Sequence, residues 1–192
     1  RASLVVSGTL SVQGSVNLGA LGCTSGTYFD MITRTCIGGV SNFTGGTYGG
    51  PGGSSNIGVY GAQSQPQEPG SAGGWGNWST PGGTGGGAIR IQAGTLNVDG
   101  SILADGNASN SNSAGGGAGG AIRIDASTLS GAGVIRAQGG AASGGGGSGG
   151  RVSVNYTTWT FTGTISAPGG NGSTDGALGT AFLGPSPDGS TF

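Results

Sequence analysis

Three aligned stretches decide the fold: GAIRIQAGTLNVDGSILADG at 87–106, GAIRIDASTLSGAGVIRAQG at 120–139 and GRVSVNYTTWTFTGTISAPG at 150–169. The second copy starts 33 residues after the first, and the third starts 30 residues after the second. Apolar residues or glycines recur at the same eight positions of each copy, and Gly-rich stretches separate the copies. Repetition at such a period indicates stacked units, none of which can bury its apolar face alone.

Partial copies flank these three. Near the N-terminus, Leu10 and Val12 match Leu96 and Val98, and Leu4 then matches position 89 if one residue is deleted. After the third copy, GALGTAFLG at 176–184 matches the opening strand of another unit. We therefore expect a single domain over 1–192, with a first coil at 3–18, a Cys-, Gly- and Pro-rich insertion at 19–86, repeat coils at 87–170, and a partial last coil and tail at 171–192.

Within each copy the apolar residues alternate with polar ones, which is typical of half-buried strands. Helix signals are missing, and each glycine inside a helix would cost about 1 kcal/mol relative to alanine. The sequence predicts an all-β fold, a parallel β-helix with about three short strands per coil. The alternative is a β-sandwich or jelly roll. The fixed spacing favours the stack, with ladders of residues 89, 122 and 152 and of residues 102, 135 and 165.

Glycines have two predicted roles. Gly100, Gly133 and Gly163 share one corner position, where either a positive φ or a close backbone approach would require glycine. The Gly-rich inserts at 81–87, 114–120 and 143–150 are either flexible surface loops or ordered segments. Extended glycine runs in polyproline-II geometry have no internal hydrogen bonds. Such runs could pair with each other as a thin second layer along the stack.

The composition excludes several classes. The chain has 192 residues, 50 of them glycine, only 7% charged residues, no His, and a net charge of −1. All six basic residues are Arg. This balance gives no basic surface for nucleic acid or an anionic membrane, and no run of 18 apolar residues predicts a membrane span. A third of the residues are apolar, which argues against disorder. Because the chain begins at Arg1, we expect a mature chain or a segment of a longer one.

The cysteines and the glycosylation sequons point to an extracellular chain. Cys23 and Cys36 stand 13 residues apart, and a disulfide between them is our leading prediction over two free thiols. With no His and only two Cys, a metal site is not expected, and no cofactor is predicted. Five Asn-X-Ser/Thr sequons predict N-linked glycans; their acceptors are Asn42, Asn77, Asn107, Asn155 and Asn171.

Two segments resemble known families. The pattern GGGAGGAIRIDASTLSGAGVIRAQGG at 115–140 resembles the Gly-rich β-helical repeats of large secreted or cell-surface proteins of bacteria and protists. The segment CTSGTYFDMITRTC at 23–36 resembles a fragment of the EGF-like, Cys-rich modules of eukaryotic surface proteins, which normally carry more cysteines. Together these resemblances imply an extracellular structural or adhesive protein, and they supply no catalytic residues.

Catalytic chemistry finds little support. Without His there is no Ser-His or Cys-His pair. The acidic residues are dispersed along the sequence, and aspartate beside glycine is explained by turn formation. The chain is therefore not predicted to be an enzyme. Arg90, Arg123 and Asp125 are expected to form a solvated surface ion pair. A threonine ladder, which could bind ice or a crystalline polysaccharide, is a minor alternative to plain strand propensity; its members are Thr9, Thr95, Thr128 and Thr158.

The functional prediction is an extracellular structural protein, the protomer of a glycosylated filament or surface appendage. Its partner would be itself, in a head-to-tail homopolymer formed through open β-helix ends. The alternative is a carbohydrate-binding or adhesin module on a cell surface, with polysaccharide as partner. Aromatic residues of the insertion would then stack on sugars, the candidates being Tyr48, Tyr60, Trp75 and Trp78. The alternative role of these rings is to cover the edge of the β-helix.

Overall fold

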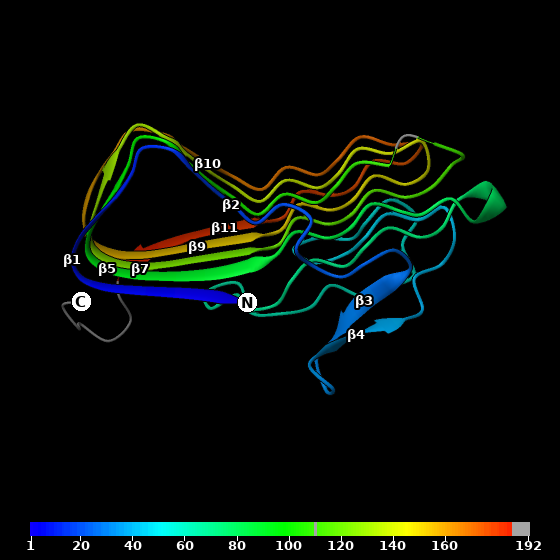
Figure 1. The fold of residues 1–192 in the computed structure, drawn as a ribbon, viewed down its shortest axis with the longest axis horizontal. Helices are drawn as coiled ribbons and strands as arrows, with labels where there is room; N and C mark the ends of the chain where they lie inside the picture. Colours follow the sequence, from blue (N-terminus) through cyan, green and yellow to red (C-terminus); the bar gives the residue numbers. More distant parts are fainter. Residues whose placement is uncertain (110, 186–192) are drawn as a thin grey trace.

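The computed structural model describes residues 1–109 and 111–185 and is built from strands (Figure 1). Within these residues the only helical element is a 3₁₀ turn, η1, at Asn77–Ser79. The all-β prediction is confirmed. Sheet one has five parallel strands, ordered β1 (Ala2–Val12), β5 (Ala88–Val98), β7 (Ala121–Gly131), β9 (Arg151–Phe161) and β11 (Thr180–Pro185). Sheet two, also parallel, is ordered β10 (Thr164–Ser166), β8 (Val134–Arg136), β6 (Ser101–Leu103) and β2 (Ser15–Asn17). A separate antiparallel hairpin pairs β3 (Thr27–Asp30) with β4 (Thr35–Gly38).

Each copy follows the same path. In Figure 1 the chain runs along sheet one, turns, returns along sheet two and then enters undulating Gly-rich segments that extend away from both sheets. Only two residues separate β5 from β6 and β7 from β8. Equivalent residues of successive copies pair directly, as in the ladders Ile89–Ile122–Val152 and Ile102–Ile135–Ile165. The predicted register of these copies is confirmed.

Each copy contributes two strands to the sheets, so the prediction of three short strands per coil is wrong. Ile91 and Ala93 face the core in β5, and so do Leu96 and Val98. The alternation of core-facing residues therefore shifts by one residue between Ala93 and Leu96, while the strand itself continues. This phase change gives the sequence the pattern of two separate strands.

The first coil differs from its predicted alignment. Leu4 pairs with Ile91 rather than with residue 89, and the register shifts between Val6 and Thr9. Two residues of β1, at 7 and 8, thus oppose the single Gly94 of β5. The first copy contains one extra residue, a β-bulge, and not a deletion. In the last coil, Ala181 pairs with Val152 as predicted; the part of the predicted tail at 186–192 lies outside the described residues.

The corner glycines are explained by close backbone approach. Gly100, Gly133 and Gly163 do not have a positive φ. A Cβ on each would collide with the carbonyl oxygen of the corresponding glycine in the preceding copy, Gly14 in the case of Gly100. The stack therefore brings the turns together more closely than any side chain allows.

The Gly-rich segments are ordered, and they form a hydrogen-bonded bundle rather than a thin layer. Donors along 115–120 have a period of three: residues three apart bond to the same neighbouring segment, at N···O distances between 2.7 and 3.0 Å. A repeat of three with no internal hydrogen bonds is the geometry of polyproline II. Three different segments thereby surround this one. The N–H groups of Gly115 and Ala118 donate to the carbonyls of residues 74 and 71, those of Gly116 and Gly119 to residues 145 and 148, and those of Gly117 and Gly120 to residues 107 and 104.

Candidate functional site

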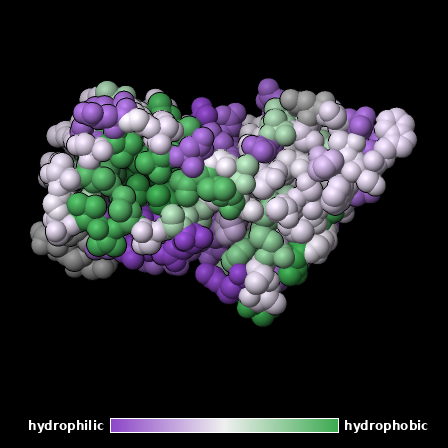
Figure 2. All heavy atoms as spheres, viewed as in Figure 1, coloured by the Kyte–Doolittle hydropathy of each residue, from purple (hydrophilic) through white to green (hydrophobic). Residues whose placement is uncertain are grey.

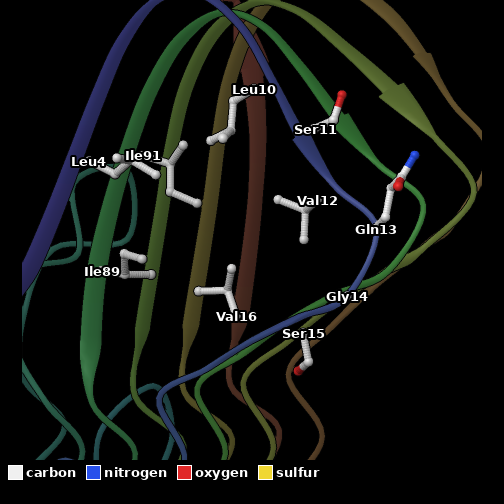
Figure 3. Close-up of a pocket in the computed structure, with 10 residues that line it drawn as sticks. All are labelled: Leu4, Leu10, Ser11, Val12, Gln13, Gly14, Ser15, Val16, Ile89 and Ile91. Atoms are coloured by element: carbon white, nitrogen blue, oxygen red, sulfur yellow. The ribbon is translucent and has the colours of Figure 1, made fainter.

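One candidate site is the end of the stack formed by β1 and β2, where the apolar core opens to solvent. Apolar side chains gather around a hollow at this end of the sheets in Figure 2, and Figure 3 shows them pointing into the space between sheet one and sheet two. The hollow has a volume of about 260 Å³. Its apolar lining consists of Leu4, Leu10, Val12, Val16, Ile89 and Ile91.

The opposite end, at β11, exposes the other terminus of the same ladder. Leu4, Ile91, Ile124, Val154 and Leu183 pair in sequence across sheet one. The three central residues are buried, whereas Leu4 is 41% exposed and Leu183 is 48% exposed. The backbone edges of β1 and β11 are the two outer edges of the sheet. The stack therefore ends at both faces in surfaces like those it buries internally.

Gly14 stands at the open end in the column of corner glycines. A Cβ added to Gly100, Gly133 or Gly163 would collide with backbone, whereas a Cβ added to Gly14 would have nothing within 4 Å among the described residues. The φ of Gly14 is not positive. The protomer itself therefore supplies no steric reason for glycine at this position. At the other three positions, glycine is required because the turn of the preceding copy stacks directly on it.

A second candidate site is the distal tip, the end of the bundle farthest from the sheets, where Figure 1 shows η1. Four predicted glycosylation acceptors lie in exposed segments of the bundle: Asn42, Asn77, Asn107 and Asn171. Asn77 lies in η1 at the tip, whereas Asn107 lies nearer the sheets, because its carbonyl accepts from Gly117 N, four residues before β7. Hydrogen bonds join these segments: Phe43 N donates to Trp75 O, Asn77 N to Asn112 O, Ser109 Oγ to Pro81 O and Ala142 N to Asn171 O. The sequence does not reveal this convergence, because the four sequons span 130 residues.

Asn155 is wrong as a glycosylation acceptor. It is 1% exposed on β9, and its amide donates to Asp125 Oδ1 at 2.8 Å. Asp125 also accepts from Arg90 and from Arg123, at 2.9 and 3.0 Å. The predicted solvated surface ion pair is therefore a covered one, since Asp125 is itself only 1% exposed.

The insertion covers this outward face of sheet one. Arg151 of β9 donates from Nε and Nη2 to the Tyr60 carbonyl, at 3.1 and 2.8 Å, and Ser153 Oγ donates to the Ser64 carbonyl at 2.7 Å. Alternation along β9 predicts that both side chains point outward, but no local pattern indicates that a segment 90 residues earlier lies over them. This covering by the insertion is the feature that sequence analysis missed.

Tyr48 and Tyr60 are not available to stack on sugars, contrary to prediction. Their rings lie 4.9 Å apart between the bundle and sheet one, and the Arg151 guanidinium lies 5.4 Å from the centre of the Tyr48 ring. The Tyr60 hydroxyl donates to Pro69 O at 2.7 Å, and the Tyr48 hydroxyl donates to Glu68 at 3.3 Å. Burial raises the pKa of both phenols above the ordinary value.

The two tryptophans of the insertion are exposed. Trp78 lies in η1 with 89% of its surface accessible, at a positive φ of 50°. Trp75 is partly exposed and sits against Gly26, where a Cβ would collide with its indole ring. These two residues are the part of the predicted aromatic set that solvent, or a ligand, can reach.

The disulfide between Cys23 and Cys36 is present, as predicted, with its Cα atoms 5.6 Å apart. It ties the β3–β4 hairpin to the bundle, because Cys23 N donates to Gly70 O at 3.1 Å. At the hairpin turn, Asp30 Oδ1 accepts from the backbone of Ile32 and Thr33. The hydrogen bonds from Thr33 lower the pKa of this exposed carboxyl.

The threonine ladder is in register, since Thr9, Thr95, Thr128 and Thr158 pair successively along sheet one. Its proposed binding of ice or crystalline polysaccharide stays a prediction. Across 1–109 and 111–185, His, Cys, Asp and Glu do not gather in groups of three or more that could hold a metal ion.

Comparison of the chain with protein-family models, curated proteins and solved structures gives no match. A search of the described residues finds no helix with the length and apolar character needed to cross a membrane. The two candidate sites, the stack ends and the distal tip, are therefore the features that bear on function.

Proposed function

We propose that this chain is an extracellular structural protein, a β-helical protomer that stacks end to end into a glycosylated filament or surface appendage. The observation that carries the proposal is the ladder from Leu4 to Leu183, buried in the middle and half-exposed at both ends. A second copy of the chain would cover both ends at once, because the same column runs through the whole stack. The disulfide fits an oxidising, extracellular environment.

In the proposed junction, the free edge of β11 pairs in parallel with the free edge of β1 of the next copy. Leu183 then lies over Leu4 and Ala181 over Ala2, which continues the side-chain columns of the interior rungs. Unpaired strand edges of this length promote association unless they are protected. Because the two joined surfaces lie at opposite ends of the molecule, the contact repeats without closing and produces an open polymer.

Gly14 provides the specific test. In the protomer an alanine at this position has free space, whereas a turn stacked on it at the interior spacing would collide with the added Cβ. In the β11–β1 junction this turn would be the one that follows Pro185 of the neighbouring copy. We expect Gly14→Ala to leave the unfolding midpoint of the protomer unchanged and to abolish or sharply weaken assembly. Gly58→Ala, at a site of the insertion with equally free space, is the matched control.

The assay is electron microscopy of the purified protein, together with sedimentation over a concentration series. Regular fibrils from the natural chain and from Gly58→Ala, but not from Gly14→Ala, would support the proposed junction. Dispersed single particles at all concentrations would refute the filament. Fibrils from Gly14→Ala with an unchanged axial repeat would refute the stacking of a turn on Gly14.

The alternative function is carbohydrate binding at the distal tip, and the exposure of Trp78 and Trp75 is the observation in its favour. Flat aromatic rings offer an apolar face to sugars. A polysaccharide pull-down that retains the natural chain but not Trp78→Ala would support this alternative. Equal retention of both proteins, or of neither, would count against it.

A further inference from the structure

The asparagines within the described residues divide into two groups by what their side chains do. Four asparagines outside sequons use their amide groups in hydrogen bonds: Asn17 to Gly19, Asn56 to Gly39 and Ser41, Asn97 to Asp99 and Ser130, and Asn112 to Thr80. The buried Asn155 also donates its amide. In these residues the side chain has an evident structural role.

The four exposed acceptors of the bundle and its tip, which we call the tip asparagines, differ from all of these. Asn42, Asn77, Asn107 and Asn171 are exposed, and none makes a side-chain hydrogen bond to any described residue. The contact that fixes Asn77 uses its backbone, whose N–H donates to Asn112 O at 2.7 Å. Asn77 is thus held through its backbone, while its exposed side-chain amide has no partner among the described residues.

Aromatic rings accompany two of the tip asparagines. The middle residue is Trp78 in one sequon and Phe43 in another, and both rings are exposed and both residues have positive φ. Trp75 lies beside them, because its carbonyl accepts from Phe43 N at 2.9 Å. Exposure of an indole ring to water is unfavourable, because removal of the ring from water lowers the free energy. A sugar attached to the neighbouring asparagine would cover the ring.

We propose that the distal tip is an N-glycosylation surface: the four tip asparagines carry N-linked glycans, and the Trp78 ring packs against the innermost sugars on Asn77. In the modification, the amide nitrogen of Asn bonds to the anomeric carbon of the first sugar and loses one proton. The bond broken is that between the sugar and the diphosphate of a lipid-linked oligosaccharide donor, which leaves as the lipid diphosphate. A transferase of the secretory pathway catalyses the exchange, so the proposal rests on the extracellular part of the proposed function.

The arrangement also explains how a heavily glycosylated chain could still assemble. The four tip asparagines lie outside the strands of both sheets, in segments of the bundle and its tip, whereas the hollow at β1 and the edge of β11 belong to the sheets. Glycans at the tip therefore leave both stacking surfaces uncovered. A polymer would carry its glycans in rows along one side.

Mass spectrometry of the native protein tests the modification. Enzymatic removal of N-glycans in isotopically labelled water converts each occupied Asn to a labelled Asp. We expect the label on the four tip peptides and none on the Asn155 peptide. Unmodified asparagine on all four tip peptides would overturn the proposal, and labelled Asn155 would overturn the argument from burial. Electron microscopy of the deglycosylated chain separates this result from the filament, because assembly does not require the glycans.

Quenching of tryptophan fluorescence by acrylamide tests the role of Trp78. The signal of this ring is obtained as the difference between the glycosylated chain and Trp78→Phe, since the chain contains three tryptophans. We expect Asn77→Gln to remove the protection of Trp78 from the quencher. Asn171→Gln, which removes the glycan of another tip asparagine, is the control and should leave the protection of Trp78 from acrylamide unchanged. Equal quenching with and without the Asn77 glycan would refute the contact.

Discussion

The substitution Gly70→Ala tests whether the hydrogen-bonded bundle is as closely packed as its geometry indicates. Gly70 is buried, its N–H donates to Gly86 O at 2.9 Å, and its φ is not positive. The Cβ of an alanine would lie 2.5 Å from Gly119 O and 2.6 Å from Ala118 O. Real Cβ atoms essentially never come within 3.0 Å of such neighbours. Two backbone segments must therefore move apart by about half an ångström, and neither is a flexible side chain.

That movement disturbs bonds on both sides. Ala118 O accepts from Gly86 N at 2.8 Å, so the strain reaches the same segment to which Gly70 donates. Overpacking in an interior costs about 1–3 kcal/mol, and each weakened hydrogen bond adds about 1 kcal/mol. We expect Gly70→Ala to lower the free energy of unfolding by about 3 kcal/mol. This exceeds the gain of about 0.4–1 kcal/mol that alanine brings by restricting the unfolded chain.

Denaturant unfolding followed by circular dichroism measures the difference, with Gly58→Ala as the control because its Cβ has free space. The control should be neutral or slightly stabilising. A loss below about 0.5 kcal/mol for Gly70→Ala, the size of an ordinary surface substitution, would show that the bundle is loosely packed.

Three further predictions concern the core, the covered ion pair and the tyrosines. Leu129→Ala, at a fully buried position of β7, should lower the free energy of unfolding by about 2–5 kcal/mol, measured by denaturant titration; an unchanged midpoint would contradict the ladder. Asp125→Ala leaves two arginines without their buried partner and should cost about 3–5 kcal/mol in the same assay, whereas a loss under about 1 kcal/mol would indicate a solvated pair. Because the folded protein raises the pKa of Tyr48 and Tyr60, the stability they contribute is complete below their ordinary pKa of about 10 and is lost as the pH rises above it. In an alkaline titration, phenolate absorbance from these two tyrosines should appear only with unfolding; their ionisation in the folded protein at the ordinary pH would contradict their burial.

The repeat could be aligned from the sequence because its signal is local and recurrent. Ile89, Ile122 and Val152 occupy the same position of three copies, and direct pairing follows once the copies stack. The number of strands per copy could not be predicted in the same way. A one-residue change of phase between Ala93 and Leu96 resembles a turn in the sequence, but the backbone accommodates it within one strand.

The candidate sites required contacts that no local pattern encodes. The sequons could be found by their residues, and Asn42 lies in Gly-rich, loop-like sequence whereas Asn155 lies in a repeat strand. Only the fold shows that the outward face of this strand is covered, so that Asn155 is buried while Asn42 is exposed. Likewise, Tyr48 and Trp78 both lie among glycines of the insertion. Only the folded chain shows that Tyr48 fills the space between bundle and sheet while Trp78 points outward. What the insertion covers depends on long-range packing, and its sequence has no repeat to indicate it.

The two halves of the molecule should respond differently to temperature. The sheets enclose aliphatic side chains, whose burial gives a positive heat-capacity change on unfolding and a driving force that weakens on cooling. The bundle buries mainly peptide groups bonded to each other, and exposure of polar surface changes the heat capacity in the opposite direction. Cooling should therefore loosen the sheets before it loosens the bundle, so that the glycine-rich half retains its order in the cold.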